Sequence, residues 1–229
     1  MVIILLLLTL IAMVSVQIVL EKVKQKKEVY KFESAEKNEL IIAKPKDLYF
    51  PRDRYYSLSH IWVKPSENFL FLGLDDFTSR FIGKIENLKI LGEKGKEINE
   101  GEVIWILKHS NRVLPQVSPV GGEILEINEK VISNLSLLNE SPYKEGWILK
   151  IRCPSLDKYI SNLLDGQIVD KWMNFVKSYF VHKFHKGPGL VYQSGGIFID
   201  GFGLELSEED WEIAKIEFFN LYKHKGGDL

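Results

Sequence analysis

The segment from residue 101 to residue 122, GEVIWILKHSNRVLPQVSPVGG, restricts the fold more than any other part of this chain. An apolar run, Val103–Leu107, is followed after a few polar residues by a second run of similar length. Ser110 and Asn111, between the two runs, belong to the residue types that favour tight turns. Two strand-like runs joined by a short polar turn predict an antiparallel β-hairpin.

Similar apolar runs recur through the middle of the chain, separated by Gly, Pro, Asn and Ser. They are Phe69–Leu72, Ile85–Leu91, Val103–Leu107, Gly122–Ile127 and Trp147–Ile151. Strands that recur about every eight to twelve residues are typical of small sandwiches and barrels. Residues 76–81 suit only one or two helical turns. The sequence therefore predicts a mainly β domain with short helices added to it.

Six ordered blocks within residues 55–154 carry a family resemblance. They include His-x-Trp-Val at residues 60–63, Gly-Leu-Asp-Asp-Phe at 73–77, Gly-Lys-Glu-Ile at 95–98, Ser-Pro-Val at 118–120, Asn-Glu at 128–129, and Leu-Asn-Glu-Ser-Pro-Tyr at 138–143 followed by Gly-Trp at 146–147. In this pattern the chain resembles the glycine cleavage system H protein family. The resemblance implies the hybrid barrel-sandwich (hammerhead) fold of biotinyl and lipoyl domains, a flattened pair of small antiparallel sheets.

In the family that the chain resembles, this hairpin presents a lysine that carries lipoate, seven residues before the serine of Ser-Pro-Val. Counting back seven residues from Ser118 reaches Asn111, and counting forward from Gly101 reaches the same position. A carboxamide nitrogen is not nucleophilic and cannot form the lipoyl amide. The sequence therefore predicts that no cofactor is attached at this position.

Lys108 is the only lysine close to the predicted tip, and it stands where the family has an acidic residue. Three residues from the tip, a strand residue faces the opposite side and lies roughly 10 Å back. We therefore do not expect a ligase that reads a lysine at an exposed turn to modify it. The rest of the tip, residues 109–112, reads as a compact turn with a solvated Arg112, although a loop on a rigid scaffold can also serve recognition.

The first 20 residues are almost entirely apolar, with Gln17 the only strongly polar member. Twenty helical residues span about 30 Å, which is the thickness of the hydrocarbon core of a bilayer. A cleaved signal peptide would need a basic start, a shorter apolar core and a small-residue cleavage site. We expect a retained anchor at residues 1–20. Lys22, Lys24, Lys26 and Lys27 follow it, so the positive-inside rule predicts a single-pass protein of the inner (cytoplasmic) membrane whose C-terminal bulk faces the cytoplasm.

Residues 21–54 are charged and read as a juxtamembrane linker with one short strand near residues 40–43. Residues 155–229 are absent from ordinary H proteins, and we expect them to form an α+β extension. Its helices are predicted at Leu156–Leu164, at Gln167–Phe184 and after Ser207, where acidic residues occupy the first turn. A two-strand hairpin is predicted at residues 190–200.

The helix at 167–184 carries a wide apolar stripe that must be buried against something. Its members are Ile168, Val169, Trp172, Phe175, Val176 and Tyr179. The stripe favours packing within the chain, and a partner surface or a second copy is the alternative. A homo-oligomer that buries this stripe between two copies is therefore one of the alternatives.

Chemical motifs are weak. His182 and His185 have helical i, i+3 spacing, but no third metal ligand is evident, so we expect no metal site. Asp75 and Asp76 have the look of paired acids, but in the fold that the resemblance implies they precede a surface turn. Nucleophile elbows, phosphate-binding loops and dinucleotide fingerprints are absent from the sequence, which predicts no catalytic residue. With 30 basic and 31 acidic residues the chain shows no nucleic-acid footprint.

Two functional hypotheses follow. The first is a membrane-tethered, non-catalytic module that keeps the H-protein fold for protein interaction or scaffolding and has lost the arm. Its protein partner cannot be read from the sequence. The second is a lipoyl carrier of glycine cleavage or of a related one-carbon or sulfur pathway. Asn111 favours the first hypothesis.

Overall fold

The structure is a computed structural model that describes residues 47–184 and 198–219. The expected membrane anchor at 1–20 and the short strand expected near 40–43 lie outside these residues. Within the described ranges, no helix is both long and apolar enough to cross a bilayer. Residues 47–54, which the sequence assigned to the linker, contact the folded part of the chain: Phe50 is buried against Tyr56, and the Tyr56 hydroxyl donates to the carbonyl of Pro51.

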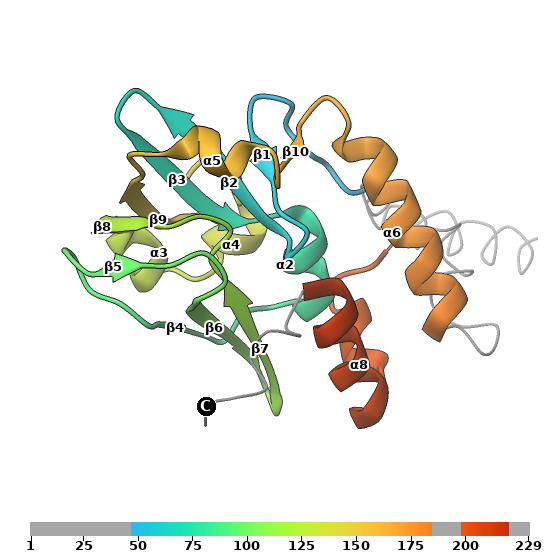
Figure 1. Cartoon of the computed structure of the whole chain (residues 1–229). Coiled ribbons are helices and arrows are strands. Elements are labelled where there is room, and N and C mark those ends of the chain that lie inside the picture. Colours follow the sequence, from blue (N-terminus) through green and yellow to red (C-terminus); the bar gives the residue numbers. More distant parts are fainter. Residues whose placement is uncertain (1–46, 185–197, 220–229) are drawn as a thin grey trace, which may run out of the picture. The chain divides into compact units, whose positions relative to one another are not determined.

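Two antiparallel sheets form the centre of the described fold (Figure 1), as the sequence predicts. The larger has the strand order β10-β1-β2-β3-β9-β8-β5 and the smaller has the order β4-β6-β7. The strands are β1 (Tyr55–Tyr56), β2 (Ile61–Ser66), β3 (Phe69–Leu74), β4 (Asn87–Ile90), β5 (Glu97–Ile98), β6 (Val103–His109), β7 (Arg112–Val117), β8 (Gly122–Ile127), β9 (Trp147–Arg152) and β10 (Leu164–Asp165). All five apolar runs named from the sequence lie on or overlap strands.

Short helices connect the strands, and longer ones follow them. They are α2 (Asp76–Ile82), α3 (Glu129–Ser133), α4 (Leu137–Glu140), α5 (Leu156–Ile160), α6 (Val169–Phe184), the 3-10 helix η1 (Phe202–Glu205) and α8 (Glu208–Phe219). Helix α2 has seven residues, so the expectation of one or two turns is confirmed. Its N-cap, Asp75, accepts a hydrogen bond from the backbone N–H of Thr78, which satisfies one of the free donors at the helix start.

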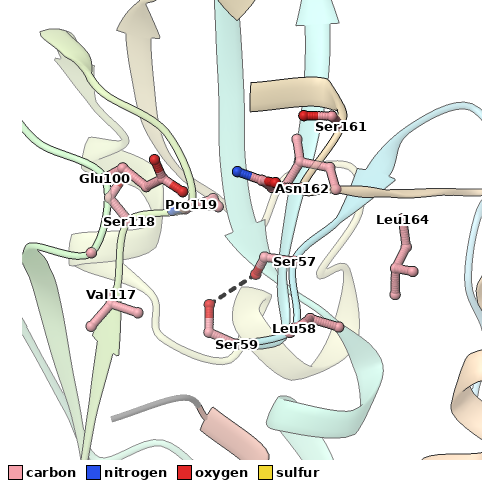
Figure 2. A pocket seen from close by; sticks show the side chains of 12 residues that line it. Ser57, Leu58, Ser59, Glu100, Val117, Ser118, Pro119, Ser161, Asn162 and Leu164 are labelled. Atoms are coloured by element: carbon pink, nitrogen blue, oxygen red, sulfur yellow. Dashed lines mark hydrogen bonds between the residues drawn. The ribbon is translucent and has the colours of Figure 1, made fainter. Parts of the chain in front are cut away.

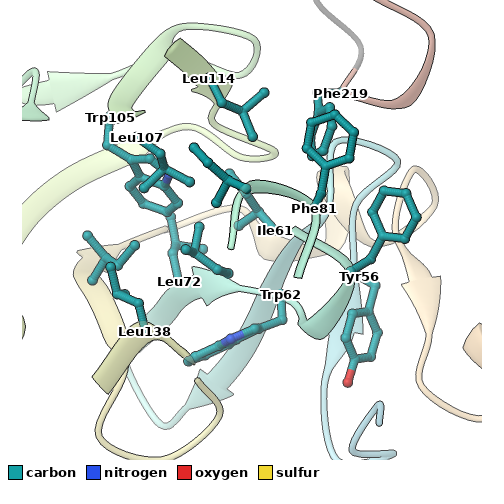
Figure 3. Close-up of a cluster of buried hydrophobic side chains, with 14 of the residues drawn as sticks. Tyr56, Ile61, Trp62, Leu72, Phe81, Trp105, Leu107, Leu114, Leu138 and Phe219 are labelled. Carbon is teal, nitrogen blue, oxygen red and sulfur yellow. The ribbon is translucent and has the colours of Figure 1, made fainter. Parts of the chain in front are cut away.

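The core lies between the sheets and α2 (Figure 3). Leu72 and Trp105 are almost fully buried there, and the indole N–H of Trp105 donates to the Gln116 side chain at 2.7 Å. Trp62 is equally buried on the other face of the large sheet, beside Tyr143. Gly73 lies against the Trp62 ring, and a Cβ at that position would come within 2.6 Å of it. A larger residue at position 73 would therefore displace the buried tryptophan.

The C-terminal extension is part of this core and not a separate appendage. Phe77 and Phe81 of α2 contact aromatic rings from both later helices and the segment between them: Phe180, Phe198, Phe202, Trp211, Phe218 and Phe219. Offset and edge-to-face aromatic pairs of this kind add to the energy of burial. The expectation that the extension packs within the chain is confirmed for these rings.

Details of the extension differ from the prediction. Helix α6 begins two residues later than expected, and α8 begins after Ser207, whose hydroxyl accepts from the N–H of Asp210 as a cap does. The helix expected over 156–164 is wrong in its second half, because Leu164 leaves the helical path to pair with Tyr56 of β1. The hairpin expected at 190–200 lies mostly outside the described residues, and its last three residues, 198–200, are not in a strand.

Only some residues of the apolar stripe predicted on α6 are buried in the structure. Val169 and Val176 are buried as expected, together with Met173 and Phe180. Ile168 and Phe175 instead face away from the core, Tyr179 is partly exposed beside Phe218, and Trp172 is half-buried beside His60. The prediction was wrong here because the helix is apolar on two faces, and the spacing alone does not say which face meets the core.

Candidate functional site

The predicted hairpin is present, with β6 and β7 joined by the two residues Ser110 and Asn111. His109 pairs with Arg112 across the turn. Ser110 has a positive φ of 52°, whereas Asn111 does not share the left-handed region. A positive φ at the first central residue alone is the pattern of a type II′ turn, whose twist suits a tight hairpin. The turn therefore places Asn111 at the tip.

The hairpin tip is exposed to solvent but is fixed by contacts with the segment before β4. Ser110 donates its backbone N–H to Glu86 Oε2 at 2.7 Å, and the imidazole Nδ1 of His109 contacts the backbone oxygen of Lys84. Both contacts join the tip to the segment that precedes β4. Asn111 itself is exposed. The tip is therefore a presented position on an anchored loop, which is the geometry that a carrier lysine needs, but the side chain there is a carboxamide.

Lys108 lies on β6, where it pairs with Val113 of β7 and Asn87 of β4. It is exposed, on the face of the small sheet opposite to the buried Leu107. Its backbone is part of a three-stranded ladder and not of a turn. The structure thus places Lys108 on the strand, as the sequence analysis expected.

Arg112 corrects the sequence analysis, which described it as solvated. Its side chain is only 10% exposed. The guanidinium donates to Glu208 Oε2 at 2.9 Å and to the carbonyl of Leu206, and it lies 5.1 Å from the centre of the Trp211 ring. These partners come from the end of η1 and from α8. The extension therefore covers one flank of the hairpin directly below its tip.

A cavity of about 490 Å³ opens at the other end of β7 (Figure 2). Its lining mixes polar and apolar side chains and comes from the loop before β2, the turn before β6, the end of β7 and the segment after α5: Ser57, Leu58, Ser59, Glu100, Gly101, Val117, Ser118, Pro119, Ser161, Asn162, Leu163 and Leu164. Six strand residues at about 3.3 Å each separate it from the tip by about 20 Å. No sequence motif marked this cavity.

Three hydroxyl groups of the cavity, those of Ser57, Ser59 and Ser118, form hydrogen bonds with one another or with the backbone. Ser57 Oγ and Ser59 Oγ are 2.9 Å apart, and Ser57 Oγ also accepts from the N–H of Ile61. Ser118 donates to the carbonyl of Val120. None of these contacts pairs a serine with a basic side chain that could remove its proton, as nucleophilic catalysis requires. These serines therefore shape the loops that line the cavity.

Asp75 and Asp76 lie at the start of the largely buried helix α2 and not before a surface turn, so that expectation was wrong. Asp75 is fully buried and its Oδ2 lies 2.7 Å from Nδ1 of His60, whose ring stacks on Phe77. Asp76 begins α2 and accepts from the N–H of Tyr49 at 2.9 Å. Burial raises the pKa of Asp76 above its ordinary value, against the opposing effects of this hydrogen bond and of Arg80. Both carboxylates serve local structure: a cap, a buried pair and a chain contact.

Potential metal ligands do not gather in the part of the chain that the structure describes, where no group of three His, Cys, Asp or Glu side chains is placed to hold an ion. His182 is exposed on α6, and His185 lies outside the described residues. Burial raises the pKa of the Cys153 thiol, which disfavours the reactive thiolate.

Known proteins share the part of the chain that forms this site. Residues 54–175 match the family model described as "Glycine cleavage H-protein". A probable glycine cleavage system H protein of Thermococcus gammatolerans is 32% identical over 120 residues, which are 52% of this chain and 88% of that protein. The glycine cleavage system H protein of Carboxydothermus hydrogenoformans is 32% identical over 114 residues, which are 48% of this chain and 87% of that protein.

Among solved structures, a glycine cleavage system H protein from Mycobacterium marinum matches with a TM-score of 0.45 and 21% identity, over 50% of this chain and 91% of that chain. The family match covers more than half of the sequence, including both sheets and the first seven residues of α6. The remainder of α6, η1 and α8 lie beyond it. On the strength of the family match, this chain belongs to the glycine cleavage H-protein family.

Proposed function

We propose that this chain is a non-catalytic, non-lipoylated H-protein module that is tethered to a membrane and acts as a protein-interaction or scaffold component. One observation carries the proposal: Asn111 occupies the presented tip of the β6–β7 hairpin. The relatives are named as glycine cleavage system H proteins, and in that family a lysine at the tip carries lipoate. Without an amine at the tip, the chain keeps the scaffold and loses the attachment point.

The alternative is a lipoyl carrier that uses Lys108. The exposure of Lys108 favours this reading, because a ligase could reach its amine. Its position opposes it, since Lys108 lies within the β4-β6-β7 ladder and a carrier lysine is read at a turn. Metal ions, other cofactors and nucleic acid have no place in either reading.

The membrane part of the proposal rests on the sequence. The apolar run at 1–20, followed at once by Lys22 and Lys24, favours a single span with the H-protein module on the cytoplasmic side of the inner membrane. Fixing the module to a bilayer would limit traffic between soluble enzymes and would suit a fixed partner. That partner is a protein still to be identified, and a second copy of the chain is one candidate.

The test is a modification assay on the full chain, read by intact mass and by peptide mapping of residues 101–122. Wild type, Asn111→Lys and Lys108→Arg are each incubated with a lipoate ligase, lipoate and ATP. We expect wild type to stay unmodified and Asn111→Lys to gain one lipoyl group at position 111. A double variant, Asn111→Lys with Lys108→Glu, restores the family's acidic residue as well and should react at least as fast.

The opposite result would be lipoylation of the wild-type chain, and the same assay detects it. A lipoyl group on Lys108 of wild type, lost in Lys108→Arg, would reject the proposal and restore the carrier function with a displaced arm. Mass analysis of the protein from its native membrane adds the decisive control, since it reports the modification made in the cell. The same sample shows whether residues 1–20 are retained.

A further inference from the structure

The outer face of α6 carries an apolar stripe that the described structure covers only at the Tyr179 end, where that ring lies 5.6 Å from the ring of Phe218. Ile168 is 49% exposed, Phe175 is 67% exposed and Tyr179 is 37% exposed. Their spacing of seven and four residues places them on one face of the helix. The rings of Phe175 and Tyr179 stack with centroids 6.0 Å apart and planes 4° apart, so the stripe is an ordered surface.

This face is additional to the one that packs on the core. Val169, Met173, Val176 and Phe180 already bury the inner side of the helix. Stability of the fold therefore does not require large apolar side chains on the outer side. A helix that is apolar on a second, exposed face is expected to contact something else.

One exposed lysine, Lys171, lies on the same face as the stripe, four residues before Phe175, and the exposed His182 lies seven residues after Phe175. Nearby acidic groups are engaged: Asp170 pairs with Arg52 at 3.4 Å, and Glu217 accepts from the Tyr179 hydroxyl and contacts Lys183. Aromatic and aliphatic side chains flanked by lysine are typical of helices that lie at the surface of an anionic bilayer.

The chain enters the described fold beside this helix. Asp47, the first described residue, pairs with Lys177 at 2.5 Å, near the middle of α6. The residues before it include the apolar run at 1–20 and, directly before Asp47, Lys44 and Lys46. The described part of the chain therefore begins beside the helix that exposes the stripe.

We infer that the outer face of α6 rests on the surface of an anionic lipid bilayer. This inference rests on the proposed membrane tether. A tether keeps the effective concentration of the bilayer high, so a small apolar surface is enough for contact. A second copy is a weaker fit, because a stable dimer buries about 800 Å² on each partner and three exposed side chains supply far less.

The experiment places an environment-sensitive fluorophore (NBD) on single cysteines of the full chain in nanodiscs that hold one copy each. The native cysteine is first removed with Cys153→Ala. Phe175→Cys then carries the label on the stripe, and Lys94→Cys carries it in the exposed turn between β4 and β5, away from α6 (Figure 1). Nanodiscs contain phosphatidylcholine alone or with phosphatidylglycerol, and spin-labelled lipid serves as the quencher.

We expect the label at 175 to shift to the blue and to be quenched by the spin-labelled lipid, with the larger effect in phosphatidylglycerol, while the label at 94 changes little. Lys171→Glu in the same background should reduce the response at 175 in anionic discs. A label at 175 that behaves as in detergent would overturn the inference and leave the tether intact. A chain that does not enter nanodiscs would reject the tether and this inference together. A blue shift in detergent that grows with protein concentration would assign the stripe to a second copy instead.

Discussion

The two flanks of the β6–β7 hairpin differ although each carries a cation near the tip. Lys108 lies on the open flank, exposed beside Asn87 and Val113. Arg112 lies on the covered flank, where Trp211, Glu208 and the carbonyl of Leu206 surround it. The covered flank is built by α8 and the residue that follows η1, which lie beyond the family match. The hairpin is therefore covered on one side by residues outside the family match, while Asn111 occupies its tip.

This contrast bears on the function proposed above. A carrier hairpin must present its arm to several enzymes, so its flanks must remain open. Here the extension occupies one flank and is joined to α2 through the shared aromatic cluster. Such a covered flank suits a fixed contact better than a travelling one, which agrees with the function proposed above.

Loss of the covered flank should have the largest effect on stability. Trp211 is almost fully buried and stacks on Phe81 with centroids 4.9 Å apart. Trp211→Ala should lower the free energy of unfolding by about 3–5 kcal/mol, the usual cost of deleting a buried aromatic side chain. Urea unfolding followed by far-UV circular dichroism measures it. Phe175→Ala, at an exposed ring, is the matched control and should change stability by less than about 0.5 kcal/mol.

An equal, small effect of both alanine variants would contradict the claim that the extension belongs to the core. The alternative would then be an extension that packs loosely and can be removed without loss. Limited proteolysis of Trp211→Ala distinguishes the two cases, because an extension freed from α2 would be cut well before the sheets unfold.

The two cations near the tip provide the next comparison. Arg112→Met should cost about 1.5–3 kcal/mol, since it removes charge-assisted hydrogen bonds from a mostly buried guanidinium. Lys108→Met should change stability by less than about 0.5 kcal/mol. Arg112→Lys should fall between wild type and Arg112→Met, because an ammonium cannot reproduce the planar fork that reaches both Glu208 and Leu206. Similar losses at positions 108 and 112 would remove the distinction between the flanks.

The sequence predicted the parts of this molecule that depend on neighbouring residues. The strands, the tight turn at Ser110–Asn111 and the cap of α8 at Ser207 follow from local patterns, and the structure confirms them. The sheet architecture came with the family resemblance. The absence of a tip lysine follows from counting along the chain, and its chemical consequence stays a prediction.

The sequence could not predict contacts between distant residues. Glu208, which pairs with Arg112, lies 96 residues away, and no motif links the two. No sequence pattern indicated that His60 and Asp75 form a buried pair. The inner face of α6 could not be chosen because both faces are apolar, so only the position of α2 decides that Phe180 turns inward while Phe175 does not.

The buried Asp76 and the exposed Asp53 should make stability depend on pH in opposite directions. Burial raises the pKa of Asp76, so the folded protein holds this proton more tightly than the unfolded chain. Its contribution to stability is present below the unfolded pKa of about 3.9 and is lost as pH rises through the higher folded pKa. The hydrogen bond from Lys64 holds the pKa of the exposed Asp53 below its usual value, against a smaller effect of desolvation. Its contribution has the opposite sign, being present above the unfolded pKa and lost as pH falls.

Urea unfolding of wild type, Asp76→Asn and Asp53→Asn at several pH values from about 3 to about 7 separates the two groups. The stability of wild type relative to Asp76→Asn should decline as pH rises, because only wild type must ionise a buried carboxyl. The stability of wild type relative to Asp53→Asn should increase over the same range, by a smaller amount because solvent screens the exposed pair. Curves of the same sign for both variants would show that Asp76 is as well solvated as Asp53. The contact of Tyr49 with the start of α2 would then be open to water, and the covered side of the module would not extend to residues 47–54.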